Sequence, residues 1–181
     1  MPKNAQPPVN KAANGQDLHD PKAAVSTPVF NIHSIYVKDL SFEAPHSPQI
    51  FNTEWKPKID FDLQMGSQIL SEPESIYEVV LHVTVTIKLG EAAEEKPAFL
   101  IDIQQAGAFS VQNFTPEATQ QLLATTCATV LFPYARETVS NLATRGGFPQ
   151  LVLPPINFDA MYEHHLKTRD TTAESSVAES H

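Results

Sequence analysis

The chain has 181 residues, a formal net charge of −9 and one cysteine, Cys127. This length is enough for one domain with a hydrophobic core, and a lone cysteine excludes an internal disulfide and a cysteine-based zinc site. The negative charge disfavours a nucleic-acid binder, which needs a basic face. It serves solubility in many proteins and also favours a basic partner.

No apolar run approaches the roughly 20 residues of a membrane span. The first 28 residues also lack the apolar region of a secretory signal. We therefore predict a cytoplasmic protein that does not insert into a membrane. Residues 1–27 and 168–181 are poor in large apolar side chains, so we predict a disordered N-terminal extension and a disordered C-terminal tail around a folded domain at 28–167.

Four segments alternate like half-buried strands. In residues 29–43 the even positions are mostly apolar, and we expect one face to carry Phe30, Ile32, Tyr36, Leu40 and Phe42. Residues 58–64 turn Ile59, Phe61 and Leu63 inward, and residues 76–89 are rich in β-branched side chains on one face. The polar stretch GEAAEEKP then turns the chain into a fourth strand, AFLIDIQQ, which completes a hairpin.

The apolar period changes after Gly107, where we expect helices to begin. Thr115 is a candidate N-cap, because Pro116 and Glu117 follow it in the first turn. Residues 116–132 then have a helical pattern. Pro133 is expected to interrupt this helix or to start a second one that glycines end at 146 and 147.

A last helix is predicted over residues 158–169, with Asn157 as its cap, after the proline-rich stretch FPQLVLPPINF. The order of four strands followed by helices predicts an α+β fold, in which helices pack on one face of a four-stranded antiparallel sheet.

Enzyme and cofactor motifs are missing. The chain has no phosphate-binding loop, no G-x-G-x-x-G turn and no G-x-S-x-G nucleophile motif. The adjacent His164 and His165 would face about 100° apart on a helix, which does not suit metal ligands. Cys127 is expected in the core, and His82 is expected on the surface near Glu78 rather than acting as a base. We predict no catalytic residues, no metal and no cofactor.

Five stretches, in order, resemble the bacterial SecB family of protein-export chaperones: IYVKDLSFEAP, YEVVLHVTVTIKLG, FLIDIQQAGAF, VLFPYARETVSNLATRGGFPQL and PPINFDAMY. The resemblance implies a homotetramer, a dimer of dimers, that holds unfolded precursor proteins without ATP and delivers them to the SecA translocation motor. The alternative is a SecB-like chaperone dedicated to one partner, such as an antitoxin.

Period 2 puts Asp39 and Glu43 on the strand face opposite the core, and it does the same for Leu100 and Asp102. Three carboxylates around one exposed leucine form either a solvated sheet face or a docking surface for a cationic partner. The resemblance implies that these four residues dock the basic, zinc-bearing tail of SecA.

Two proline-rich stretches carry large apolar side chains, which either cover the core or line a groove for clients. The resemblance implies that the segment between the first two strands lies at the client site. The predicted groove residues are Ile50, Phe51, Trp55, Phe148, Leu151, Leu153, Phe158, Met161 and Tyr162.

Overall fold

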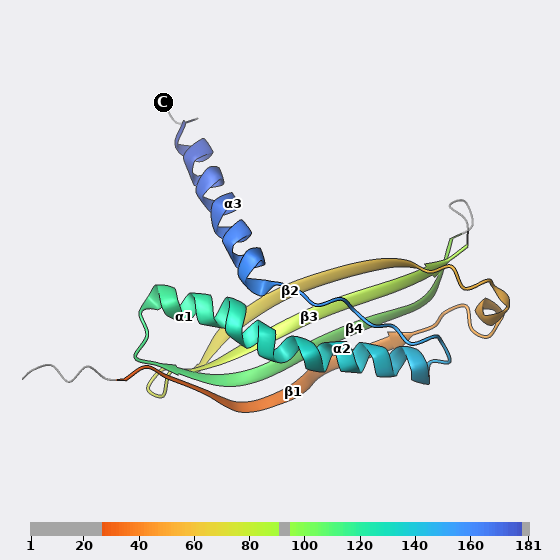
Figure 1. Ribbon diagram of the computed structural model, residues 1–181, viewed down its shortest axis with the longest axis horizontal. Helices are drawn as coiled ribbons and strands as arrows, with labels where there is room; N and C mark the ends of the chain where they lie inside the picture. Colours follow the sequence, from red (N-terminus) through yellow and green to blue (C-terminus); the bar gives the residue numbers. More distant parts are fainter. Residues whose placement is uncertain (1–26, 91–94, 179–181) are drawn as a thin grey trace, which may run out of the picture.

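The structure is a computed structural model that describes residues 27–90 and 95–178, with side chains as far as residue 169. Its elements in chain order are β1 (Val29–Glu43), the 3-10 turn η1 (Gln49–Asn52), β2 (Lys58–Ser71), β3 (Ile76–Leu89), β4 (Lys96–Gln112), α1 (Pro116–Leu122), the π-helical η2 (Leu123–Cys127), α2 (Ala128–Arg145) and α3 (Phe158–Ala178) (Figure 1). The predicted N-terminal extension lies outside the described residues, apart from residue 27.

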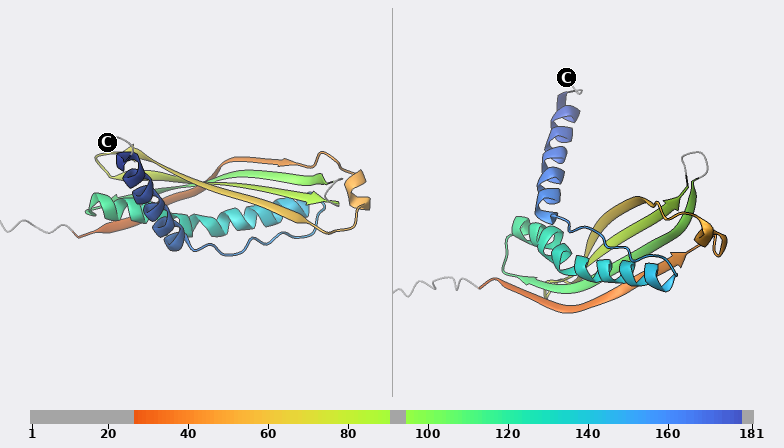
Figure 2. Two further views of the ribbon diagram at one scale, coloured as in Figure 1. Left: turned by 90° about the horizontal axis from the view of Figure 1, so that it is seen from above. Right: turned by 45° about the vertical axis from the view of Figure 1, so that its right-hand side comes forward.

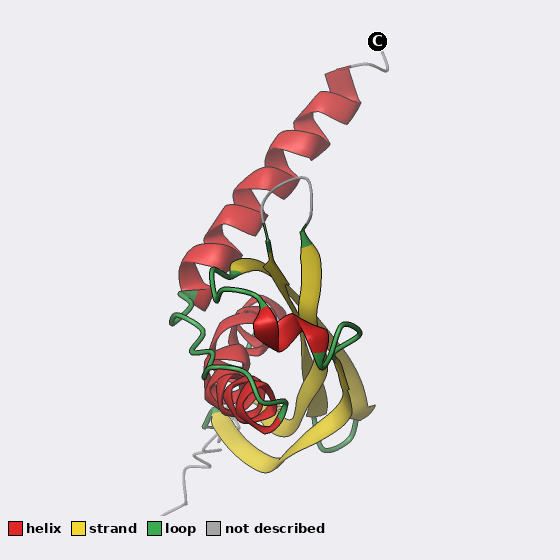
Figure 3. Cartoon of the chain, turned by 90° about the vertical axis from the view of Figure 1, so that its right-hand side faces the viewer, coloured by secondary structure: helices red, strands yellow, loops and turns green. Residues whose placement is uncertain are grey.

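The four strands form one antiparallel sheet in the order β1-β4-β3-β2, which leaves β1 and β2 at its edges. The helices lie on one side of this sheet, as the end-on view in Figure 3 shows. The predicted α+β fold is therefore confirmed. β2 runs to Ser71, beyond the predicted end at residue 64, because it pairs with β3 along its full length.

α1, η2 and α2 follow one another as a long rod across one face of the sheet (Figures 1 and 2). The rod packs on the central strands β3 and β4, whose inward side chains are almost all fully buried. The α2 residues in this core are Ala128, Leu131, Phe132, Ala135, Val139 and Ala143. The face of the sheet beneath the rod is called the inner face below, and the opposite face is called the outer face.

β4 does not end near Gly107, as the sequence suggested, but continues to Gln112. A Cβ at Gly107 would lie 2.8 Å from the ring of Phe109 and 2.9 Å from the side chain of Leu131. Gly107 is therefore present because α2 approaches the strand closely there, and it does not mark a turn.

Pro133 does not interrupt the helix and lies inside α2, while the irregular turn occurs earlier, at η2. Proline removes one helical hydrogen bond, to the carbonyl of Thr129. Both Pro133 and Thr129 are exposed, so water can satisfy that carbonyl. The predicted N-cap is confirmed, since the Thr115 hydroxyl accepts a hydrogen bond from the Ala118 amide at 3.2 Å.

α3 begins after Asn157, whose side-chain oxygen accepts a hydrogen bond from the Ala160 amide at 2.9 Å, as predicted for a cap. The helix projects away from the sheet (Figure 1) and extends to Ala178. It therefore continues beyond residue 167, into the segment predicted to be a disordered tail, because no glycine or proline follows Phe158 to end it. Residues 179–181 lie outside the described part. None of the described helices combines the length and apolar character that a membrane crossing requires.

Candidate functional site

The four predicted docking residues lie on the outer face of the sheet. Residues paired across an antiparallel ladder share a face, and Ile101 and Ile103 of β4 are fully buried beneath the helices. Leu100 and Asp102 therefore point outward. Glu43 lies directly opposite Leu100 in the pairing of β1 with β4.

The same ladder places Ser41 opposite Asp102 and Asp39 opposite Gln104. Asp39, Glu43, Leu100 and Asp102 thus occupy three neighbouring rows on one face, and they are called the acidic patch below. No described helix covers this face, as Figure 2 shows from two sides.

The acidic patch keeps most of its negative charge. Asp39 and Glu43 are exposed, and neither forms an ion pair with any residue that the structure describes. Asp102 is half-buried, and both its carboxylate oxygens lie 2.9 Å from Nε2 of His82, while Thr84 donates a hydrogen bond to it at 3.0 Å. The patch therefore attracts cations, with Leu100 as an apolar contact among the carboxylates.

One prediction for this face was wrong. β1 has two bulges, between Ile32 and Ser34 and between Val37 and Asp39. Each bulge shifts the alternation of inner and outer side chains by one residue. Residues 34–37 therefore face the side opposite to the one predicted, and from Asp39 onward the side chains face as predicted. Tyr36 consequently points outward instead of toward the core, and Ile35 takes the inner face.

His82 contacts Asp102 rather than Glu78, and this pairing depends on strand register and not on sequence spacing.

An aromatic cluster forms where the crossover segment between β1 and β2 packs against Phe148, which follows α2. The ring of Phe148 lies 4.7 Å from Phe99, 5.0 Å from Phe51, 6.1 Å from Trp55 and 6.5 Å from Phe42, between ring centroids. Phe148 is only 6% exposed, whereas Phe51 and Trp55 are 49% and 37% exposed. Phe148 therefore forms the floor of this cluster, and the two crossover residues form its rim.

The predicted groove residues divide by exposure. Those that are buried in the core, and so cannot contact a ligand directly in this conformation, are Ile50, Phe148, Leu153 and Phe158. Those that are exposed or half-buried are Phe51, Trp55, Leu151, Met161 and Tyr162. Phe148, Leu153 and Phe158 are buried because the chain after α2 lies along the helix rod, whereas Ile50 is buried from η1. Sequence alone did not reveal this placement.

The inner face of β2 carries a further apolar surface, which the sequence pattern did not identify. β2 turns Ile59 and Phe61 to the inner face, as predicted, and Met65 follows on the same face. The helix rod covers the central strands more than this edge strand. The exposed fractions are therefore 50% for Ile59, 41% for Phe61 and 43% for Met65. The β-strand pattern identified the inner face of β2 correctly. It gave no signal that this part of the face lacks a covering layer.

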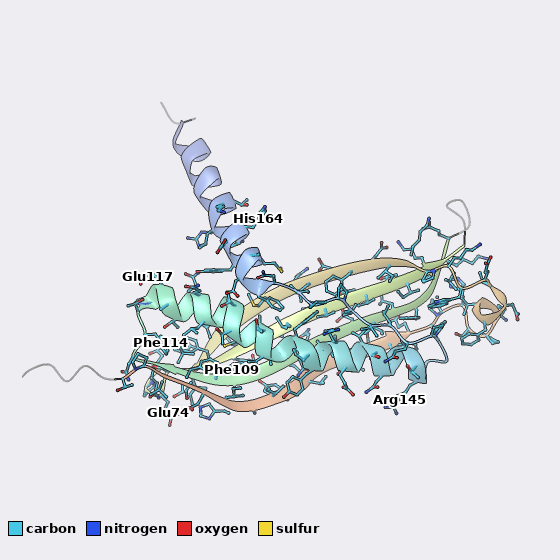
Figure 4. The ribbon with its side chains drawn as sticks, in the orientation of Figure 1. Glu74, Phe109, Phe114, Glu117, Arg145 and His164 are labelled. Carbon is cyan, nitrogen blue, oxygen red and sulfur yellow. The ribbon has the colours of Figure 1, made fainter. Side chains whose placement is uncertain are left out.

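The inner face of β2 ends in a hollow of about 340 Å³ between β2, η2 and the start of α3. Its apolar lining includes Leu63, Met65, Leu123, Met161 and Tyr162. His165 also borders this hollow, whereas His164 lies on α3 away from the sheet (Figure 4). An exposed apolar surface with an adjoining hollow is a candidate binding region.

Cysteine and potential metal ligands were the remaining candidates for a reactive centre in the described part of the chain. Cys127 is fully buried in the core, and burial raises the pKa of its thiol to about 12. Within the described ranges, no group of three or more His, Cys, Asp or Glu side chains is arranged to hold a metal ion.

The family described as preprotein translocase subunit SecB matches residues 23–169, most of the chain. The chain belongs to the SecB family. It is 44% identical over 156 residues to the protein-export protein SecB of Hahella chejuensis, a match covering 86% of this chain and 94% of the relative. It is 46% identical over 148 residues to the protein of the same name from Methylococcus capsulatus, covering 82% and 92%.

A solved structure has the same fold: the SecB-like chaperone of Mycobacterium tuberculosis in complex with a peptide from the HigA1 antitoxin. The two structures superimpose with a TM-score of 0.59 at 21% identity, over 71% of this chain and 91% of the other. Family membership confirms the function predicted from the resemblance, that of a protein-export chaperone.

Proposed function

We propose that this SecB-family protein holds unfolded precursor proteins without ATP, as a cytoplasmic homotetramer that lacks enzymatic activity, and hands them to the SecA translocation motor. One observation carries the proposal. The sheet separates an open acidic face from an apolar inner side, so that a motor and a client have different surfaces to bind. Such a division allows both partners to be held together during transfer.

The acidic patch is proposed to bind the basic, zinc-bearing tail of SecA. Asp39 and Glu43 are exposed and form no ion pair with the residues that the structure describes, so their carboxylates are available to steer and orient a cationic segment. Leu100 is half-buried at the strand next to Glu43 and supplies apolar area at the centre of the contact.

The client is proposed to bind along the inner side, from the rim formed by Phe51 and Trp55, over β2, to the hollow beside Met161 and Tyr162. Phe148, Leu153, Phe158 and Ile50 support this surface from below, and Leu151 lies half-exposed beside it. Burying on the order of 1,000 Å² of client apolar surface yields roughly 25 kcal/mol. Ordering some tens of client residues costs about as much, at roughly 1 kcal/mol each, so binding is reversible without a nucleotide.

The docking proposal is tested by reversing the charge at Asp39, Glu43 and Asp102 together and titrating a SecA tail peptide by calorimetry at low salt. We expect affinity to fall by more than tenfold while client holding is retained. The matched control reverses Glu72, Glu74 and Glu117, of which Glu74 and Glu117 are labelled at the opposite end of the sheet (Figure 4). Equal affinity of the two triple variants would refute the docking surface.

The client proposal is tested with the double variant Phe51→Ala and Trp55→Ala. We expect weaker suppression of aggregation for several unrelated unfolded proteins, with little loss of stability, because both side chains are largely exposed. Protection of one partner only, unchanged by the double variant, would instead favour a dedicated chaperone. The relatives named above as protein-export proteins do not favour that alternative.

A further inference from the structure

A second feature of the outer face lies next to the acidic patch. It is a shallow hollow of about 410 Å³ over β4, β3 and β2. In the strand register, Ala106, Val80 and Gly66 form one row across the sheet, directly opposite one another. A Cβ built at Gly66 would have no atom within 4 Å, so the hollow is open there because this residue has no side chain.

One wall of the hollow is built around a buried carboxylate. Glu78 is 4% exposed, and its oxygens accept hydrogen bonds from Tyr36 at 2.5 Å, Lys38 at 2.7 Å and Gln68 at 2.6 Å. The hydrogen bond from Lys38, followed by that from Tyr36, holds the pKa of Glu78 below its usual range. The charges of Glu78 and Lys38 thus cancel, and this wall is fixed and neutral.

The opposite wall is shared with the acidic patch. Asp39, Gln104, His82 and Gln64 form the next row across all four strands. His82 binds Asp102 of the patch, and Gln104 makes no side-chain hydrogen bond with any residue in the described ranges. The rim of the hollow therefore offers amide groups, while Val80 supplies an apolar side chain at its floor.

We propose that this hollow is a second subsite for the basic segment that docks on the acidic patch, and that it takes one aromatic side chain of that segment. The inference rests on the proposed docking function. The Lys38–Glu78 pair leaves this wall without net charge, so the hollow offers a cation no free carboxylate. An anion would be repelled by the neighbouring acidic patch, so an uncharged side chain fits best. A cavity of about 150 Å³ is enough for one aromatic ring, so the hollow has room for a ring together with its adjoining main chain, whose polar groups can bond to the amide rim.

The strand geometry sets the spacing of the ligand. Val80 lines the hollow and pairs with Ala106, which is itself fully buried and follows Asp102 by four residues on β4. Val80 therefore lies about 13 Å from Asp102 along the strand direction. An extended peptide that runs parallel to β4, with a lysine or arginine on Asp102, therefore brings its fourth following residue level with Val80 in the hollow. The partner segment is expected to carry an aromatic residue four positions from its cationic cluster.

The test uses two synthetic peptides, each with a cluster of three lysines and either tyrosine or alanine at the fourth position beyond the last lysine. We expect the tyrosine peptide to bind the wild-type protein about five- to tenfold more tightly. Gly66→Leu fills the hollow at a position with room for it, and should reduce the affinity of the tyrosine peptide to that of the alanine peptide. Gly66→Ala is the matched control and should preserve most of the difference.

Equal binding of the two peptides to the wild-type protein, or an undiminished preference for tyrosine in Gly66→Leu, overturns the subsite. A further outcome also overturns the subsite. If an unfolded client abolishes the extra affinity of the tyrosine peptide and leaves the affinity of the alanine peptide unchanged, the hollow binds clients instead. If Gly66→Leu does not fold, Gln104→Trp narrows the hollow from its other wall. The triple charge reversal at Asp39, Glu43 and Asp102 separates the two proposals: if it leaves the alanine peptide bound, the docking function itself is wrong.

Discussion

The aromatic cluster yields the sharpest stability prediction, for the variant Phe148→Ala. Phe148 is 6% exposed and packs between Phe99 of β4 and the crossover residues Phe51 and Trp55. Its amide also donates a hydrogen bond to the Ala143 carbonyl at 3.0 Å, which fixes the chain just after α2. Removal of the ring leaves a cavity at the point where the crossover segment, the sheet and the end of α2 meet.

The expected cost in unfolding free energy is about 3 kcal/mol. Truncating a buried phenylalanine to alanine costs about 3–5 kcal/mol, depending on how far the site collapses. The rim rings of Phe51 and Trp55 are partly exposed and so are free to move into the gap, which favours the lower end of that range. The control Phe51→Ala should cost only about 1 kcal/mol, because half of that side chain is already exposed.

Urea unfolding of the wild type and both variants, at one fixed protein concentration because oligomers gain stability by mass action, measures these costs. Trp55 is the only tryptophan in the chain, so intrinsic fluorescence reports on this cluster directly. A cost for Phe148→Ala no greater than that for Phe51→Ala would show that Phe148 is not the floor of the cluster. The division of the client surface into floor and rim would then be wrong.

Three further predictions follow from single contacts. Gly146→Ala should lower stability by about 1–3 kcal/mol in the same urea assay, because the new Cβ would overlap the ring of Phe42; an unchanged midpoint would contradict this packing. Cys127 should resist a thiol reagent in the native protein and react fully in denaturant, because burial raises its thiol pKa to about 12; rapid native labelling would show that the helix rod opens readily. The hydrogen bond to Glu78, with burial and the Glu78 charge, raises the pKa of Tyr36 to about 12, so Glu78→Gln should lower the pKa of one tyrosine toward the ordinary range in a spectrophotometric titration. Folding lowers the pKa of Glu78, so its contribution to stability is present above the pKa of an unfolded glutamate and is lost as the pH falls. The wild type should therefore lose more stability in acid than the glutamine variant.

The sequence by itself determined the features that depend on local backbone geometry. Alternation in β3 identified the strand and its buried face, and side-chain chemistry identified the caps Thr115 and Asn157. Asp39 and Glu43 could be assigned to a common face because no bulge lies between them. Each of these inferences involves residues only a few positions apart, where periodicity and hydrogen bonding are set by the chain itself.

Only the tertiary structure decided which of these faces are covered and which side chains meet across strands. The bulges that turn Tyr36 outward arise from the pairing of β1 with β4, and they bring its hydroxyl to Glu78, 42 positions further along the chain. The helix rod covers β3 and β4 but leaves the inner face of β2 open, so similar apolar strands become core in one case and surface in the other. Burial and register are properties of neighbours that are distant in sequence, and no local pattern encodes which neighbour will be present.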